Sequence, residues 1–112
     1  MIDLRRVRYF VAVAEELHFG RAAARLGISQ PPLSQQLQAL EQDLGARLLH
    51  RNKRQVSLSE AGQLFLPDAR ALLAQAERAA SIAARAARGE LGTLRVGFTE
   101  SAVLTGALPN LL

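Results

Sequence analysis

The sequence predicts a mainly α-helical fold in three parts. Apolar residues recur every three or four positions in three short segments before residue 45, and this spacing places them on one face of a helix. An alanine-rich segment from about residue 58 to residue 88 shows the same periodicity over a greater length. A hinge flanked by glycines, residues 89–92, then leads into an apolar stretch typical of a strand. We therefore expect a small helical domain, a long helix, and the first βα unit of an α/β domain that this chain does not complete.

The first two helices are predicted from the apolar faces that they would bury. In the first helix this face consists of Leu4, Val7, Phe10, Val11, Ala14 and Leu17. The second helix spans residues 20–26 and would bury Ala22, Ala23 and Leu26. Gly27 can adopt the positive φ that commonly ends a helix, so we expect the second helix to stop there.

The third helix is predicted in the stretch ISQPPLSQQLQALE, residues 28–41. Its apolar face consists of Leu33, Leu37 and Leu40. Its other face carries no charge and consists of Pro31, Ser34, Gln35, Gln38 and Gln42. Proline disfavours the α conformation in the residue before it, so we expect the helix to begin at Pro32 and to end near Leu44.

Ser29 precedes this helix and would be a poor N-cap. A capping side chain accepts a hydrogen bond from the N–H group of the second or third helical residue. Were Ser29 the cap, those residues would be Pro31 and Pro32, which have no N–H group to donate. We therefore expect the Ser29 hydroxyl to be available to a phosphate.

A basic β-hairpin is predicted after the third helix. Apolar and polar residues alternate over residues 55–58, as in a half-buried strand. Residues 48–51 could pair with residues 54–58 across Asn52-Lys53, where asparagine favours a turn. The tip of the hairpin would then present Arg51, Lys53 and Arg54.

Together these elements favour DNA binding. Two helices joined by a short turn, the second of them amphipathic, form a helix-turn-helix, and a hairpin after it makes the winged version. The free face of the third helix would enter the major groove, where glutamine is suited to a bidentate contact with adenine. Basic residues would hold phosphates, and Arg51 or Arg54 would enter a narrow minor groove. The residues expected to contact DNA are Arg21, Arg25, Ser29, Gln30, Pro31, Pro32, Ser34, Gln35, Gln38, Arg51, Lys53 and Arg54. The alternative is that the glutamines form an ordinary solvated helix face.

The long helix carries a heptad seam that could pair with a second copy of the chain. The seam consists of Phe65, Ala69, Leu72, Ala76, Ala79, Ala83 and Ala86. Its small side chains would let a partner helix approach closely; the alternative is that the seam packs on its own domain. Ser57 with Glu60 fits a capping box at the helix start, although Ser59 could cap instead. Pro67 removes one backbone hydrogen bond, so we expect a kink or a fresh helix start there.

Composition narrows the possible functions. The chain has 112 residues, 49% of them hydrophobic, and a net charge of +4. Residues 1–58 hold nine basic and five acidic side chains, and this positive balance favours a polyanion as partner. The absence of cysteine excludes disulfides and thiolate metal sites, and no apolar stretch is long enough to span a bilayer. We expect a soluble cytoplasmic protein without a cofactor. An enzyme is not expected, because the sequence offers no Ser-His-acid set and no phosphate-binding glycine loop.

The sequence resembles the N-terminal part of LysR-type transcriptional regulators over nearly all of its first ninety or so residues. The resemblance rests on the run from LRRVRYF through AARLGISQPPLS and LEQDLGARLLHR to VSLSEAG. It implies a winged helix-turn-helix, a linker helix that pairs with a second subunit, and a C-terminal effector domain of periplasmic-binding-protein type. It also implies assembly as dimers of dimers on an interrupted inverted repeat of double-stranded DNA. The base-reading positions would be Gln30, Pro31, Pro32, Ser34 and Gln35, with Arg54 in the minor groove. Many relatives carry arginine where this chain has Gln35, which suggests an altered base preference.

The resemblance also implies a sensor function. The sequence motifs EELHFGRAA and SQPPLS are similar to those of regulators of aromatic-compound catabolism. In this family the effector site opens at the end of the first strand of the effector domain, where this chain has Thr99, Glu100 and Ser101. Thr99 and Ser101 would help to hold a small acidic effector in the complete protein, because a helix N-terminus binds carboxylates. Alternatively, one of them simply caps the helix.

A competing interpretation treats the whole chain as a protein-interaction module. The alanine seam would then be the functional surface and the basic N-terminal half would be incidental. This interpretation predicts dimerisation without a steep, salt-dependent affinity for DNA.

Overall fold

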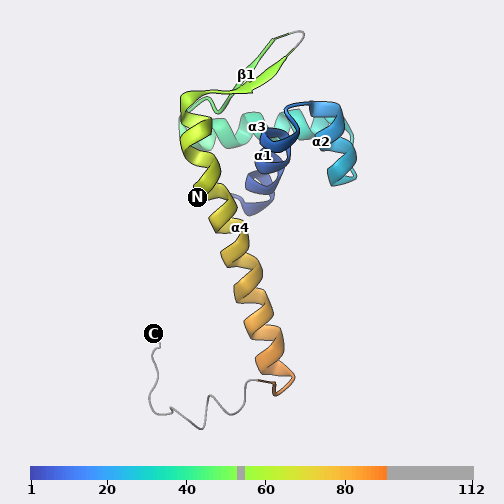
Figure 1. Cartoon of the computed structure of the whole chain (residues 1–112), viewed down its shortest axis with the longest axis vertical. Helices are drawn as coiled ribbons and strands as arrows, with labels where there is room; N and C mark the ends of the chain where they lie inside the picture. Colours follow the sequence, from blue (N-terminus) through green and yellow to red (C-terminus); the bar gives the residue numbers. More distant parts are fainter. Residues whose placement is uncertain (53–54, 91–112) are drawn as a thin grey trace. The chain divides into compact units, whose positions relative to one another are not determined.

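The computed structural model describes residues 1–52 and 55–90, and its elements follow the predicted order (Figure 1). The elements are α1 (Leu4–Glu16), α2 (Phe19–Leu26), α3 (Gln30–Leu44), β1 (Leu49–Arg51), β2 (Val56–Leu58) and α4 (Glu60–Ala87). The chain divides into two compact units, Met1–Gln75 and Ala76–Leu112, and the first contains α1 to β2 and the start of α4. The strand expected at 93–98 and the helix expected after it lie outside the described residues. None of the helices described is long and apolar enough to cross a membrane.

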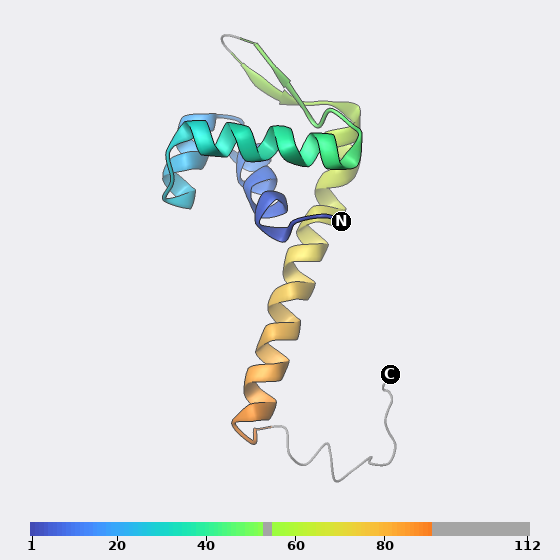
Figure 2. The same ribbon diagram turned by 180° about the vertical axis from the view of Figure 1, so that it is seen from behind.

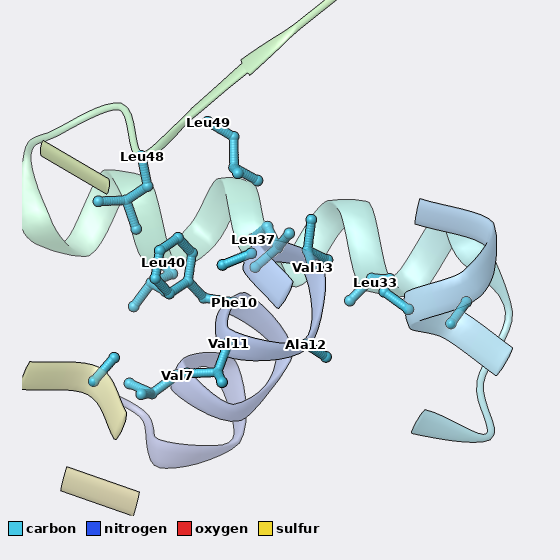
Figure 3. Packing of buried hydrophobic residues seen from close by; sticks show 14 residues of the cluster. Val7, Phe10, Val11, Ala12, Val13, Leu33, Leu37, Leu40, Leu48 and Leu49 are labelled. Carbon is cyan, nitrogen blue, oxygen red and sulfur yellow. The ribbon is translucent and has the colours of Figure 1, made fainter. Parts of the chain in front are cut away.

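The core of the first unit lies where α1, α2 and α3 meet. Phe10, Leu33, Leu37 and Leu40 are at most 1% exposed, which confirms the apolar face predicted for the third helix and the middle of the face predicted for the first. Figure 3 shows these side chains packed together with those of the β1 region. The closely packed buried side chains hold the outer face of α3 in a fixed orientation.

The face predicted for α1 is wrong at its two ends. Leu4 is 44% exposed and Leu17 is 46% exposed. Leu17 has a positive φ of 50° and lies just beyond the helix, so its side chain leaves the apolar face. Conversely, Ala12 and Val13 are buried although the predicted face omits them. A helix covered on more than one side buries residues that a single stripe does not include.

The third helix begins two residues earlier than predicted, at Gln30 instead of Pro32. The conformational penalty before a proline is a preference, and in a first turn the missing N–H groups have no intrahelical acceptor to lose. Ser29 is the N-cap and its side chain makes no capping hydrogen bond, as predicted from the two prolines that follow it.

The predicted hairpin forms, but the turn predicted across Asn52-Lys53 is wrong: the second strand begins at Val56 instead of residue 54, and the turn extends from Asn52 to Gln55. β1 and β2 pair antiparallel, with Leu49 opposite Leu58 and Arg51 opposite Val56. The turn is closed by Asn52, whose Oδ1 accepts a hydrogen bond from the Gln55 N–H group at 2.7 Å. The hairpin therefore has an inner face against the core and an outer, solvent-facing side.

Ser59, the alternative that the sequence offered, caps the start of α4. The Ser59 hydroxyl accepts a hydrogen bond from the Gly62 N–H group at 3.0 Å and donates one to the Arg47 carbonyl at 2.6 Å. Ser57 lies in β2 and does not cap the helix. Of the two alternatives predicted at Pro67, a kink or a fresh helix start, the fresh start is wrong, because Pro67 lies inside α4. Figure 2 shows α4 as one continuous helix.

Candidate nucleic-acid interface

The outer face of α3 is exposed and uncharged over its first three turns. Figure 2 shows α3 in front of α1 and α2, with no described element over its outer side. The exposed residues are Ser29, Gln30, Pro31, Pro32, Gln35 and Gln38, and Ser34 is half-buried among them. The apolar side of the same helix is fully occupied by the core, so this polar face is the one left for a partner.

The hairpin and the N-terminus of α3 form one continuous surface. Gln30, Pro31 and Ser34 line an open depression together with Arg51 and Asn52 from the hairpin. Phe19, at the start of α2, contributes to the same depression. The arrangement places residues from both predicted DNA-contacting elements side by side, as a protein that follows two adjacent grooves requires.

Arg51 does not have the position predicted for it at the hairpin tip. Its Nη2 atom lies 3.4 Å from Glu41 Oε1, and its guanidinium carbon lies 5.6 Å from the centre of the Phe19 ring. Its side chain is only 24% exposed. The inner face of β1 carries Arg51 toward the helices, so the side chain is held within the domain. Lys53 and Arg54, the other two residues expected at the tip, lie outside the described residues.

The two arginines of α2 are exposed but are paired within the domain. Arg25 lies 2.7 Å from Glu15 and 3.3 Å from Glu16, and Arg21 lies 3.6 Å from Glu16. The hydrogen bond from Arg25 lowers the pKa of the Glu15 carboxyl, and Arg70 of α4 lowers it further. Burial opposes both effects. A phosphate would have to compete with these carboxylates for both arginines.

Sequence reasoning missed two polar residues that fix this surface. His18 caps α2, because its Nδ1 atom accepts a hydrogen bond from the Arg21 N–H group at 2.9 Å. Glu41 of α3 accepts hydrogen bonds from the backbone of Leu48 and Leu49, at 2.8 and 3.2 Å. The available signal was that Glu41 follows buried Leu40 and interrupts a helix face of uncharged residues. Among the described residues, no group of acidic side chains and histidines could hold a metal ion.

Comparison with known proteins identifies the architecture. Residues 4–63 match the model of the family described as bacterial regulatory helix-turn-helix protein, lysR family. This match covers more than half of the chain. The chain belongs to the LysR family.

The relatives of this LysR-family chain are longer than the chain itself. It is 61% identical over 111 residues to YnfL of Escherichia coli K12, an uncharacterized HTH-type transcriptional regulator, covering 99% of this chain and 37% of YnfL. It is 52% identical over 101 residues to the transcriptional regulator AlsR of Bacillus subtilis 168, covering 90% of this chain and 33% of AlsR. Its structure is similar to that of the DNA-binding domain of CbnR in complex with DNA, with a TM-score of 0.73 and 46% identity. That match covers 77% of this chain and 99% of the CbnR chain.

The predicted seam of the linker helix is divided between two environments. The Phe65 ring lies 5.4 Å from that of Phe10, and Ala69 is completely buried in the core. At these two positions the seam therefore packs on its own domain, which was the alternative to pairing with a second copy. Leu72 is 39% exposed. The remaining positions lie in the second unit, with Ala76 half-buried and Ala79, Ala83 and Ala86 exposed.

Proposed function

We propose that this chain binds double-stranded DNA sequence-specifically as the N-terminal part of a LysR-type transcriptional regulator. The observation that carries the proposal is the exposed, uncharged face of α3, which shares a depression with the hairpin. The 46% identity to a domain that was crystallised on DNA supports it. In this role α3 lies in the major groove and the hairpin follows the adjacent minor groove.

Each part of the surface has a distinct role in this proposal. Gln30 and Gln35 present amides that can make bidentate contacts with adenine, and Pro31 presents a flat apolar ring to a thymine methyl group. The hydroxyl of Ser29 makes no capping bond and is available to a phosphate at the helix N-terminus. Pro32, Ser34 and Gln38 extend the same contact surface. Lys53 and Arg54 supply positive charge at the hairpin tip.

Self-association is proposed through the seam positions of α4 that the core of the first unit does not bury. Leu72, Ala76, Ala79, Ala83 and Ala86 leave an apolar stripe that a second copy could cover. Structures of full-length CbnR with its target DNA and of a full-length BenM mutant are among those that match this chain. A dimer, and a dimer of dimers in the full-length protein, would present two or more copies of α3 to an inverted repeat.

The wider role of the protein follows the family. Thr99 and Ser101 lie outside the described residues, and we keep them as proposed contacts to a small acidic effector in the complete protein. We also propose that the protein belongs to the subgroup that regulates aromatic-compound catabolism. Action as a transcriptional regulator agrees with the names of the relatives. A location in the cytoplasm and the absence of catalysis and of a cofactor stay predictions from the sequence.

The proposed function is tested by titrating the chain with two duplexes of equal length. One carries the inverted repeat upstream of its own gene and the other is a scrambled sequence. We expect preference for the first and an affinity that falls as salt rises, because phosphate contacts release counterions. Equal and salt-insensitive binding to both duplexes would contradict the proposal.

A further inference from the structure

The carboxylate of Glu41 connects α3 to the start of the hairpin through hydrogen bonds. Its Oε2 atom accepts hydrogen bonds from two successive backbone N–H groups, those of Leu48 and Leu49. Its Oε1 atom faces Arg51 Nη2 at 3.4 Å. The Glu41 side chain is only 13% exposed. One side chain of α3 therefore holds three donors from residues 48–51, the segment that leads into the hairpin turn.

Arg51 is poorly satisfied in this arrangement. Among the residues that the structure describes, its buried Nε atom has no hydrogen-bond partner and its one ion pair, with Glu41, is long. Replacing a buried ion pair with apolar residues of similar volume is often neutral or stabilising, so stability alone does not explain the pair. A buried polar group can instead fix one arrangement of neighbouring elements. Here the neighbouring elements are α3, the Phe19 end of α2, and β1.

The connection from Glu41 to the hairpin would position the surface proposed to contact DNA. Arg51 is followed directly by Asn52, which closes the hairpin turn through Gln55. Arg51 and Asn52 line the same depression as Gln30, Pro31 and Ser34 of α3. A small rotation of β1 about the start of the strand would move the hairpin tip relative to the N-terminus of α3.

We propose that Glu41 is a positioning residue that sets the hairpin relative to α3, with Arg51 acting as its strut and not as a contact to DNA. The inference rests on the proposed DNA-binding function and deepens it. Glu41 determines whether the two elements can read adjacent grooves at the same time. Without its charge, α3 still reads the half-site while the hairpin loses its fixed place.

The test uses the duplex that the wild-type chain enriches from a random pool. Two preferences are measured for each variant: the half-site preference, against a duplex with an altered half-site, and the flank preference, between A-tract and G·C flanks. We expect Glu41→Gln to reduce the flank preference by about fivefold or more, as for the loss of one groove contact, and to retain the half-site preference. A merely destabilised domain would bind every duplex more weakly by the same factor, because only its folded fraction binds, and both preferences would stay at their wild-type values.

Asp43→Asn is the matched control. Asp43 also lies on α3, and its replacement by asparagine also removes one negative charge. In the wild-type chain, however, Asp43 pairs with Arg6 of α1 at 2.8 Å and not with the hairpin. This control should keep both preferences. A folded Glu41→Gln variant with the wild-type flank preference would overturn the proposal, as would an equal loss in Asp43→Asn.

A second variant keeps the proposal testable if Glu41→Gln does not fold. Arg51→Met retains side-chain volume over Phe19 and leaves Glu41 its two backbone bonds. We expect it to melt cooperatively and to lose flank preference; an unchanged flank preference would overturn the proposal. If the wild-type chain enriched no sequence at all, the proposed DNA-binding function itself would fail. That result differs from a failure of the Glu41 proposal, in which the wild-type chain enriches a sequence and the variants keep its flank preference.

Discussion

At the residue scale, the junction between the hairpin and α4 depends on a glycine. A Cβ atom on Gly62 would overlap the backbone carbonyl of Leu48. That carbonyl also accepts a hydrogen bond from the Ser59 N–H group at 3.0 Å, and the Ser59 hydroxyl caps α4. The close approach therefore explains the glycine in the sequence VSLSEAG, which contributed to the family resemblance without a structural reason.

Gly62→Ala separates packing from helix propensity. Propensity alone predicts that alanine would stabilise α4 by about 1 kcal/mol. The overlap with a hydrogen-bonded backbone group predicts a loss of about 1–3 kcal/mol. We expect the loss to dominate, because the Leu48 backbone cannot move without disturbing the Ser59 cap. Urea denaturation measures the free energy of unfolding, and a variant as stable as the wild type or more stable would contradict this packing.

Gln30→Ala tests base reading by a single residue. Gln30 is exposed at the first position of α3, so its loss should leave the fold unchanged. We expect a loss of about 1–3 kcal/mol on the preferred duplex and relaxed preference at one base pair. Gln63→Ala, on the exposed surface of α4, is the control. Equal losses on preferred and random DNA, measured by titration, would reject a reading role for Gln30.

At the element scale, Glu15 joins three helices. Its carboxylate lies 2.7 Å from Arg25 of α2 and 3.0 Å from Arg70 of α4. Arg25 is the larger cause of the lowered pKa of Glu15. Because the folded-state pKa lies below the ordinary value, the pairing stabilises the folded state above that value, and this contribution disappears as the pH falls through the folded-state pKa.

Glu15→Gln should therefore have a pH-dependent effect. Near neutral pH we expect the variant to melt below the wild type. The difference should shrink as the pH falls below about 4.5, the ordinary value for this carboxyl. Melting curves at several pH values follow the difference. A difference that is constant over this range would show that the Glu15 charge does not contribute.

Sequence patterns predicted elements better than the contacts between them. The periodicity of the leucines in α3 fixes which face is buried, and the prolines correctly predict that the Ser29 side chain makes no capping hydrogen bond. The position of Arg51 was missed because it depends on Phe19 and Glu41, which are remote in sequence and meet it only after folding. The heptad seam of α4 likewise does not show that Ala69 packs against its own domain. Periodicity specifies a face but not its partner.

At the scale of the whole molecule, we expect the stripe of α4 from Leu72 to Ala86 to pair with a second copy of the chain. Ala76→Glu would place a charge in this stripe and should split a dimer, because an unpaired charge is costly in an apolar interface. Ala74→Glu is the control, since Ala74 is exposed and lies off the stripe. Sedimentation measures the oligomeric state. An intact dimer with Ala76→Glu would reject this stripe as the interface.

The central claim is that α3 reads the major groove while the hairpin lies in the adjacent minor groove. Dimethyl sulfate footprinting tests it directly, since this reagent methylates guanine N7 in the major groove and adenine N3 in the minor groove. On the duplex that the chain prefers, we predict protection of guanine N7 within each half-site and of adenine N3 immediately beside it. Protection confined to one groove, or none at either position on a bound duplex, would contradict the account.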